Sequence, residues 1–206
     1  MPKVSIIVPN YNYRKYLPQR LQSIFEQTFT DYEVILLDDC STDGSRQYLQ
    51  QFASHPKVSH LILGETNTGN PFVQWEKGIA LAQGEYIWIA ESDDYCDKTF
   101  LQNAVRILDE KPRISFTHCG SILVDQDGKK LERNYDTWPL GKDNGKTYTY
   151  TSHQYLKDFM LYHDETYNAS MTVFRKSKYH LIDKDFTAMH YCGCLLSTST
   201  IPRDCS

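Results

Sequence analysis

Three carboxylates close together in the sequence give this chain its clearest chemical signal. Glu91, Asp93 and Asp94 directly follow a largely apolar run at residues 85–90. A strand that ends in clustered acids can hold a divalent cation, because Mg²⁺ and Mn²⁺ prefer oxygen ligands and share them with substrate phosphates. The same acids could instead cap the helix that follows, where negative charge is also favoured. Polar groups delivered by other elements decide between these two interpretations.

The elements that must position these acids alternate between strand and helix. Short apolar runs predict strands at residues 4–8, 33–37, 58–63 and 85–90. Helical periodicity predicts helices at residues 16–27, 45–52 and 100–108, and another through Trp75, Ile79 and Ala82. Pro18 suits the first turn of its helix, and we expect Gly84 to end the helix before the fourth strand. This alternation predicts an α/β fold with a mostly parallel, Rossmann-like sheet and helices on both faces.

Three of the predicted strands end in polar residues. Asn10-Tyr11-Asn12 follow the first strand, Asp38-Asp39 follow the second, and the acids at 91–94 follow the fourth. The carboxyl ends of parallel strands share one edge of the sheet, and ligands bind there at the point where the strand order reverses. Acids that only decorated the surface would have no reason to share that edge. The pattern therefore favours a ligand site over a helix cap.

The second half of the sequence is less regular. We expect a β-hairpin over residues 114–124 with its turn at Asp127-Gly128, a long loop at 134–149, a helix at 152–161 and a strand at 169–174. A basic run at residues 175–178 follows that strand. We interpret residues 1–110 as a nucleotide-binding half and residues 111–206 as a partner-substrate half built on the same sheet.

Composition excludes several classes of protein. The 206 residues carry a net charge of -4, which provides no basic field for a nucleic-acid backbone. No apolar run approaches the ~20 residues of a membrane span, and Pro9 interrupts the apolar start too early for a signal peptide. The six cysteines are even in number, which would permit disulfides, but without a secretory signal we expect reduced thiols in a cytoplasmic protein. Cys192-Gly193-Cys194 lacks the spacing of a zinc site.

Several motifs, taken in order, resemble those of the family-2 glycosyltransferases. They occupy residues 4–12, 23–28, 38–45, 84–87 and 92–94, with a weaker extension at Phe174-Arg175-Lys176. Motifs in the right order over residues 1–110 are far more specific than any one of them. The resemblance implies a GT-A fold with a smaller β/α half on the acceptor side. It also implies a nucleotide-diphosphate-sugar donor (a UDP-sugar is expected), a divalent metal and inversion at the anomeric carbon.

The resemblance assigns donor binding to a set of residues in the first half. These are Pro9, Asn10, Tyr11, Asp39, Asn67, Gly69, Lys77 and Asp93. Pro9 and Tyr11 would line the base and ribose pocket, and Asp39 would hydrogen-bond the pyrimidine. Lys77 would supply a positive charge to the diphosphate where many members carry an Arg-Asn pair, although a solvated helix lysine is the alternative.

By the same resemblance, Asp93 and Asp94 would hold the ribose and an Mn²⁺ or Mg²⁺ ion. Glu91 stands where many members have the first Asp of an Asp-x-Asp motif. A glutamate oxygen is a competent ligand for these cations. Its side chain is longer than that of aspartate, so Glu91 is a third candidate ligand whose direct role the sequence leaves open.

The general base is the main departure from the family pattern. Cys194 occupies the position where inverting members carry an Asp, which leaves the catalytic residue unassigned. The sequence offers other proton acceptors without a specific warrant: Asp164, Glu165, Asp183, Asp185, His163 and His190. Residues 197–206 show neither helical nor strand periodicity, so a truncated or frameshifted C-terminus is one hypothesis.

We weigh three functions on this basis. The leading hypothesis is a metal-assisted, inverting transferase that moves a sugar from a nucleotide-diphosphate donor to a glycan or lipid-linked acceptor. The second is a nucleotide-sugar-binding protein that lacks the base and does not complete transfer. A nucleotidyltransferase is disfavoured, because the N-terminal region has no Gly-rich phosphate loop. A lipid-linked acceptor would place the protein at the cytoplasmic face of a membrane, with residues 175–178 as either a membrane contact or a solvated turn.

Overall fold

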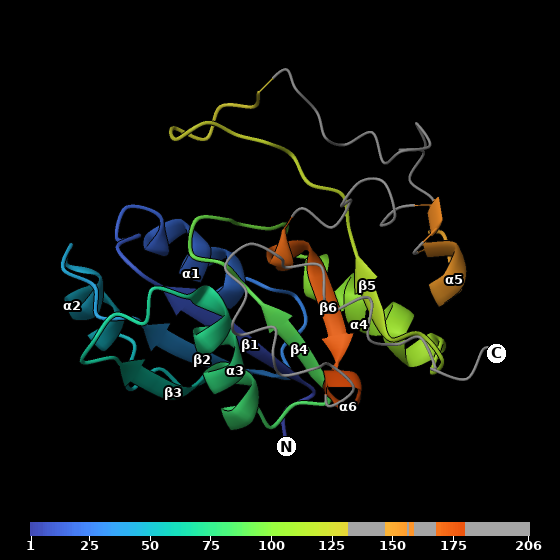
Figure 1. Cartoon of the computed structure of the whole chain (residues 1–206), viewed down its shortest axis with the longest axis horizontal. Helices are drawn as coiled ribbons and strands as arrows, with labels where there is room; N and C mark the ends of the chain where they lie inside the picture. Colours follow the sequence, from blue (N-terminus) through green and yellow to red (C-terminus); the bar gives the residue numbers. More distant parts are fainter. Residues whose placement is uncertain (132–146, 156, 159–167, 180–206) are drawn as a thin grey trace.

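The computed structural model describes residues 1–131, 147–155, 157, 158 and 168–179. Within these ranges the chain forms a six-stranded sheet with the strand order β3-β2-β1-β4-β6-β5 (Figure 1). The strands are β1 (Val4–Asn10), β2 (Tyr32–Asp38), β3 (Val58–Leu63), β4 (Tyr86–Ile89), β5 (Phe116–His118) and β6 (Thr172–Arg175). The helices are α1 (Leu17–Phe25), α2 (Ser45–Gln50), α3 (Pro71–Leu81), α4 (Phe100–Glu110), α5 (Ser152–Tyr155) and α6 (Lys176–Tyr179), and a 3₁₀ turn, η2 (Ala169–Met171), precedes β6.

The direction of the strands confirms a mostly parallel sheet. β1, β2, β3 and β4 are parallel, whereas β6 runs antiparallel to both of its neighbours, β4 and β5. The chain moves outward from β1 through β2 to β3 and then places β4 on the other side of β1. The strand order therefore reverses between β1 and β4, which is where ligands bind in sheets of this kind.

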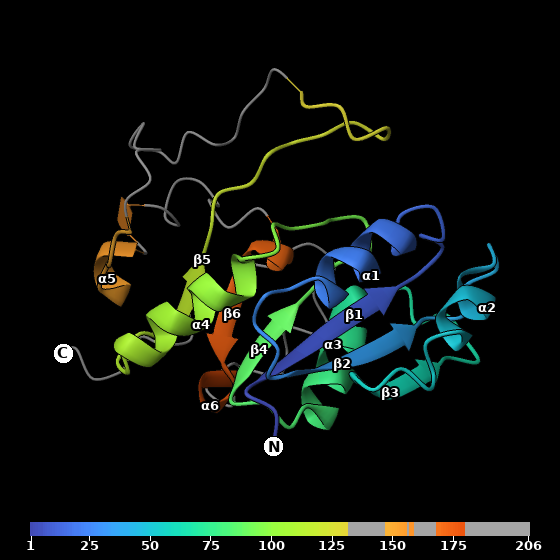
Figure 2. The same ribbon diagram turned by 180° about the vertical axis from the view of Figure 1, so that it is seen from behind.

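Alternate residues of the central strands face opposite sides of the sheet. Val4, Ile6 and Val8 of β1 pack in one core with α1 and α4, whereas Ile7 packs in a second core with α3. Figures 1 and 2 show α3 on one face and α1 and α4 on the other. The predicted coverage on both faces is confirmed, and every element predicted for residues 1–110 is present with its ends displaced by a few residues.

The predicted role of Gly84 as a helix terminator is wrong. α3 ends at Leu81, and the next residue, Ala82, is already extended, with φ -60° and ψ 134°. Gly84 lies instead against β1, where an added Cβ would come within 2.5 Å of the Ser5 backbone nitrogen. Its N–H donates to the Ser5 hydroxyl at 2.8 Å. The position therefore requires glycine because of a close backbone contact.

The predicted hairpin over residues 114–124 is also wrong. Within that segment β5 forms a ladder, but its partner is β6 and not the chain that follows the turn. The turn itself is present: Gly128 has φ +79°, and Val124 and Lys130 form an isolated antiparallel bridge. The predicted strand at 169–174 begins as the 3₁₀ turn η2. The expected helix at 152–161 is helical from Ser152 to Tyr155, and most of the expected loop at 134–149 lies outside the described residues.

The first two residues of the basic run at 175–178 are bonded into the fold, so the predicted solvated turn is limited to the exposed residues 177 and 178, and the membrane contact stays a prediction. Arg175 is buried, and its guanidinium donates to the Ile114 carbonyl at 2.8 Å and to Glu85 at 3.0 Å. Lys176 donates to the Ala82 carbonyl. These bonds tie the end of β6 to the strands and helices around it. No helix in the described part of the chain has the length and apolar character needed to cross a membrane.

We expect Gly78→Ala to destabilise the protein, although alanine normally favours a helix over glycine. A Cβ at position 78 would lie 2.4 Å from the Cγ2 atom of Ile7, so α3 could not keep its distance from β1. Overpacking of this kind costs about 1–3 kcal/mol. Urea unfolding of the variant measures the loss, with Lys77→Ala at an exposed position of the same helix as the control. Equal stability of wild type and Gly78→Ala would contradict the close packing.

We also expect the free energy of unfolding to fall as the pH is lowered from 6.5 towards 4. Burial lowers the pKa of His118 to about 4 from its ordinary value of 6.5. Between these values the unfolded chain binds a proton that the folded chain does not, so acid favours unfolding. His118→Gln should therefore have a shallower pH slope in this window. Chemical denaturation between pH 4 and 7 tests this, and His153→Gln, at an exposed position, should keep the wild-type slope.

Candidate functional site at the strand ends

The carboxyl ends of β1, β2 and β4 meet where the strand order reverses. Asn10 pairs with Asp38 in the ladder, and the Asp39 N–H donates to the Asn10 carbonyl at 2.8 Å. On the other side of β1, the Ser92 hydroxyl donates to the Pro9 carbonyl at 2.7 Å. These bonds bring the three polar clusters to one edge of the sheet. The predicted convergence is confirmed.

The Asn10 side chain joins the ends of β1 and β2. Its amide donates to Asp38 at 2.9 Å and to the Ser41 hydroxyl at 3.1 Å, and Asp38 accepts from the Ser41 N–H at 2.9 Å. Asn10 and Asp38 are almost fully buried. The Asn10 side-chain oxygen has no hydrogen-bond partner in the part of the chain that the structure describes. It is therefore an unused acceptor at this edge.

Asp39 is tied to two other elements. One carboxylate oxygen accepts from Gln74 Nε2 at 2.6 Å and the other from Thr68 Oγ1 at 2.7 Å, while the Thr68 N–H lies 3.1 and 3.0 Å from the two oxygens. Gln74 is on α3 and Thr68 is in the preceding loop, so Asp39 fixes that loop at the end of β2. Asn67 and Gly69 are exposed in the same loop, where Asn67 accepts from the Gly69 N–H at 2.6 Å. Their role in donor binding stays a prediction.

Two tyrosines that follow β1 and one lysine of α3 are exposed. Tyr11 and Tyr13 are each 42% exposed. The negative charge of Asp93 raises the pKa of Tyr13, which places Tyr13 in the electrostatic field of the acids. The sequence interpretation missed Tyr13. Lys77 is exposed on α3, whereas Gln74 of the same helix is buried in the contact described above. The predicted role of Lys77 stays untested.

Glu91 differs from the other two acids. Its carboxylate accepts a hydrogen bond from the Trp75 indole N–H at 2.7 Å. Burial raises the pKa of Glu91 to about 7 although this hydrogen bond acts in the opposite direction, and the charges of Asp93 and Asp94 raise the pKa further. Metal ligands must be deprotonated. A cation would have to displace a proton from Glu91 near neutral pH, and the role of Glu91 as a third ligand stays a prediction.

Asp93 and Asp94 fit a cation better. Asp93 is exposed, with a pKa raised by loss of solvation and by the neighbouring Asp94. Asp94 Oδ2 accepts from Asn168 Nδ2 at 2.6 Å and lies 3.7 Å from Arg20 Nη2. Across the described ranges, no group of three or more His, Cys, Asp or Glu side chains is arranged to hold a metal. Two carboxylates are nevertheless sufficient for a cation whose other ligands are phosphate and water.

Arg20 holds the backbone at the start of the acidic segment. It is fully buried on α1, and its Nε donates to the Glu91 carbonyl at 2.7 Å while Nη2 donates to Ser170 Oγ at 2.9 Å. The same Ser170 oxygen accepts from the Glu91 N–H at 2.9 Å. The sequence interpretation missed both residues. Arg20 did carry a signal, because a charged residue there interrupts the buried stripe formed by Leu17 and Leu21.

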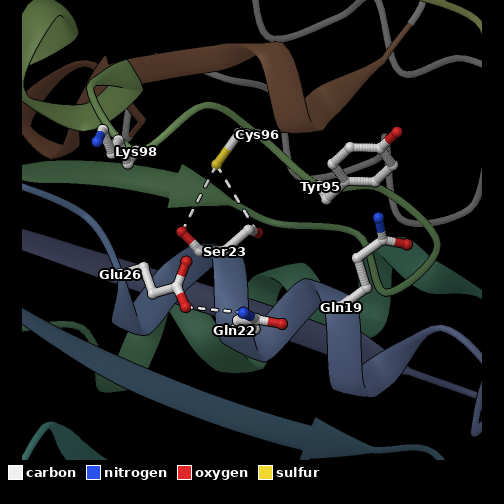
Figure 3. A pocket seen from close by; sticks show the side chains of 7 residues that line it. All are labelled: Gln19, Gln22, Ser23, Glu26, Tyr95, Cys96 and Lys98. Atoms are coloured by element: carbon white, nitrogen blue, oxygen red, sulfur yellow. Dashed lines mark hydrogen bonds between the residues drawn. The ribbon is translucent and has the colours of Figure 1, made fainter.

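A separate cavity of about 210 Å³ lies between α1 and the chain after the acids (Figure 3). Its lining residues are mostly polar: Gln19, Gln22, Ser23, Glu26, Tyr95, Cys96 and Lys98. The Cys96 sulfur lies 3.9 Å from the Ser23 hydroxyl. None of the three acids lines this cavity, so it does not form part of the site at the strand ends.

The proposed catalytic residues cannot be placed. Cys194 and the alternative bases all lie outside the described residues: Asp164, Glu165, Asp183, Asp185, His163 and His190. The described thiols, Cys40, Cys96 and Cys119, are free.

The fold and the site together define a class of protein. The crystal structure of Staphylococcus aureus TarS 1-349 in complex with UDP matches with a TM-score of 0.57 at 25% identity, covering 85% of this chain and 47% of that one. The mannosyltransferase PcManGT from Pyrobaculum calidifontis, in complex with GDP-Man and Mn²⁺, matches with a TM-score of 0.52 at 29% identity, covering 57% and 35%. The fold is that of the GT-A glycosyltransferases, as predicted.

Sequence comparison gives the family. The model of glycosyl transferase family 2 matches residues 5–181, and the chain belongs to that family. One relative is the putative teichuronic acid biosynthesis glycosyltransferase TuaG of Bacillus subtilis, which is 35% identical over 132 residues. That alignment covers 64% of this chain and 52% of TuaG. This chain thus spans about half the length of that relative.

We expect Asp39→Asn to lower the free energy of unfolding by about 1–3 kcal/mol, because it replaces an acceptor with a donor that faces Gln74 or Thr68. Both of those side chains donate to Asp39 in the wild type. Urea denaturation provides the measurement. Asp31→Asn, at the exposed position just before β2, is the matched control and should stay close to wild type. Equal stability of the two variants would show that the Asp39 network does not hold the loop.

Proposed function

We propose that this protein transfers a sugar from a nucleotide-diphosphate donor, a UDP-sugar, to a glycan or lipid-linked acceptor with inversion. The observation that carries the proposal is the convergence of Asp39, Asp93 and Asp94 at the point where the strand order reverses. Membership of glycosyl transferase family 2 supports it. So does the similarity to TarS, whose crystal structures include complexes with UDP and UDP-GlcNAc.

The donor would bind along the ends of β1 and β2. Asp39 would accept a hydrogen bond from the pyrimidine, and the exposed ring of Tyr11 would pack against the base or ribose. The unused oxygen of Asn10 offers a further acceptor at this edge. Because Asp39 is already fixed by α3 and its preceding loop, a nucleotide would meet a carboxylate whose orientation is set before binding.

Asp93 and Asp94 would hold an Mn²⁺ or Mg²⁺ ion together with the diphosphate. When bound, the cation neutralises negative charge on the leaving diphosphate. The similarity to PcManGT, whose structure is in complex with GDP-Man and Mn²⁺, supports a cation of this kind. Arg20 donates a hydrogen bond to the Glu91 carbonyl and so holds the backbone just before these two acids. The chain therefore fixes the start of the acidic segment before any ligand arrives.

The acceptor hydroxyl needs a general base within hydrogen-bond reach, and that base is unassigned in this chain. The alternative function is thus a nucleotide-sugar-binding protein that does not complete transfer. The name of TuaG, which refers to teichuronic acid biosynthesis, supports a glycan polymer as the acceptor. We place the protein in the cytoplasm, or at the inner face of a membrane if the acceptor is lipid-linked. Arg175 and Lys176 bond into the fold, which leaves the exposed Lys178 as the lysine of that run available to such a membrane.

Isothermal titration with UDP and Mn²⁺ tests the proposal. The double variant Asp93→Asn/Asp94→Asn should lose on the order of tenfold or more in affinity for UDP in the presence of Mn²⁺, because each 1.4 kcal/mol of lost interaction is tenfold. Asp127→Asn, in the exposed turn after the β-bridge residue Val124, is the control. Unchanged affinity in the double variant would reject the cation site. A wild type that binds UDP-sugars but transfers none of them would favour the alternative function.

A further inference from the structure

The two carboxylate oxygens of Asp94 have different surroundings. Oδ2 accepts from Asn168 Nδ2 at 2.6 Å and lies 3.7 Å from the buried guanidinium of Arg20. Oδ1 has no hydrogen-bond partner among the residues that the structure describes. The Asp94 carboxylate is therefore held through Oδ2, and Oδ1 is available to bind a ligand.

The Asn168 amide is itself held in one orientation. Its side-chain oxygen accepts from the Ser170 N–H at 2.7 Å and caps the 3₁₀ turn η2. With the oxygen committed to Ser170, the amide nitrogen must face Asp94, so the hydrogen-bond network fixes which end of the amide donates. Ser170 is fixed in turn, because its carbonyl accepts from the Trp88 indole N–H at 2.9 Å.

Arg20 adds a positive charge whose position is fixed by burial and hydrogen bonds. Arg20 lies on the buried face of α1, and its guanidinium carbon lies over the Trp88 ring, 5.7 Å from the ring centroid. Its Nη2 donates to Ser170 Oγ at 2.9 Å and also faces Asp94 Oδ2. A partly buried cluster thus links α1, the acids after β4 and the turn before β6.

We propose that Asn168, assisted by Arg20, is a positioning residue that orients Asp94 so that its free oxygen faces the donor's cation. The inference rests on the proposed function. Groups that hydrogen-bond to a metal ligand orient that ligand, and their loss typically weakens metal binding by about 10–100-fold. Asn168 lies in the second half of the chain, beyond residues 1–110. The affinity of the donor site for its cation therefore depends on the turn before β6.

Two substitutions separate the contact with Asp94 from the cap on Ser170. Asn168→Ser retains a short side-chain oxygen that can cap the turn but cannot reach Asp94. Asn168→Ala removes both interactions. Titration of Mn²⁺ in the presence of saturating UDP, followed by electron paramagnetic resonance, should show an affinity about tenfold or more weaker in both variants. The midpoint of thermal unfolding should fall in Asn168→Ala and stay near wild type in Asn168→Ser.

Affinity for UDP in EDTA should be the same in wild type and both variants, because the proposed effect acts through Asp94 and the cation. Asn103→Ser, on the exposed surface of α4, is the control and should bind Mn²⁺ like wild type. If wild type binds Mn²⁺ and Asn168→Ser binds it equally well, the inference is overturned while the proposed function stands. Weaker binding in Asn168→Ala alone would assign the effect to the cap and also overturn it. If wild type binds neither UDP nor Mn²⁺, both fail.

Discussion

The parallel pairing of β1 with β2 on one side and β4 on the other is the constraint on which the site depends. Val8 and Pro9 of β1 lie beside Leu36 and Leu37 of β2, and Ile7 lies beside Ile89 of β4. Because the three strands run in the same direction, the residues that follow each of them reach the same edge. Helices cover both faces of these strands. Polar side chains therefore find hydrogen-bond partners most easily at the strand ends.

That edge is also where the fold must accommodate carboxylates that are partly removed from water. Four of the acids accept a hydrogen bond from a side chain of another element. Asn10 of β1 donates to Asp38, α3 supplies Gln74 for Asp39 and Trp75 for Glu91, and Asn168 before η2 donates to Asp94. Carboxylates without such partners would be costly to bury. The acidic site is consequently assembled by tertiary contacts from both halves of the chain, and a change in any supporting element would alter the acid that it holds.

Local patterns were sufficient to predict the first half of the fold. The alternation of apolar runs and helical stripes gave β1 to β4, α1 to α4 and the convergence of Asn10, Asp39 and Asp93. The contact between Asn168 and Asp94 had no local signal, because the pairing of β6 with β4 brings together residues far apart in the sequence. The sequence marked Gly84 as a special position, but the reason is its close contact with the backbone of β1 and not the end of a helix. The turn at Gly128 was also predicted, but the strand that pairs with β5 is β6.

The glutamate at position 91 changes how charge is distributed in this site. Its side chain reaches the Trp75 indole, and burial raises the pKa of Glu91 to about 7, so near neutral pH it contributes only part of a negative charge. The buried guanidinium of Arg20, 3.7 Å from Asp94 Oδ2, offsets part of the negative charge of this segment. Three full carboxylate charges beside a diphosphate would repel the donor in the absence of a cation. The burial of Glu91 and the pairing of Asp94 with Arg20 reduce that repulsion while leaving one oxygen of Asp94 for a cation to bind.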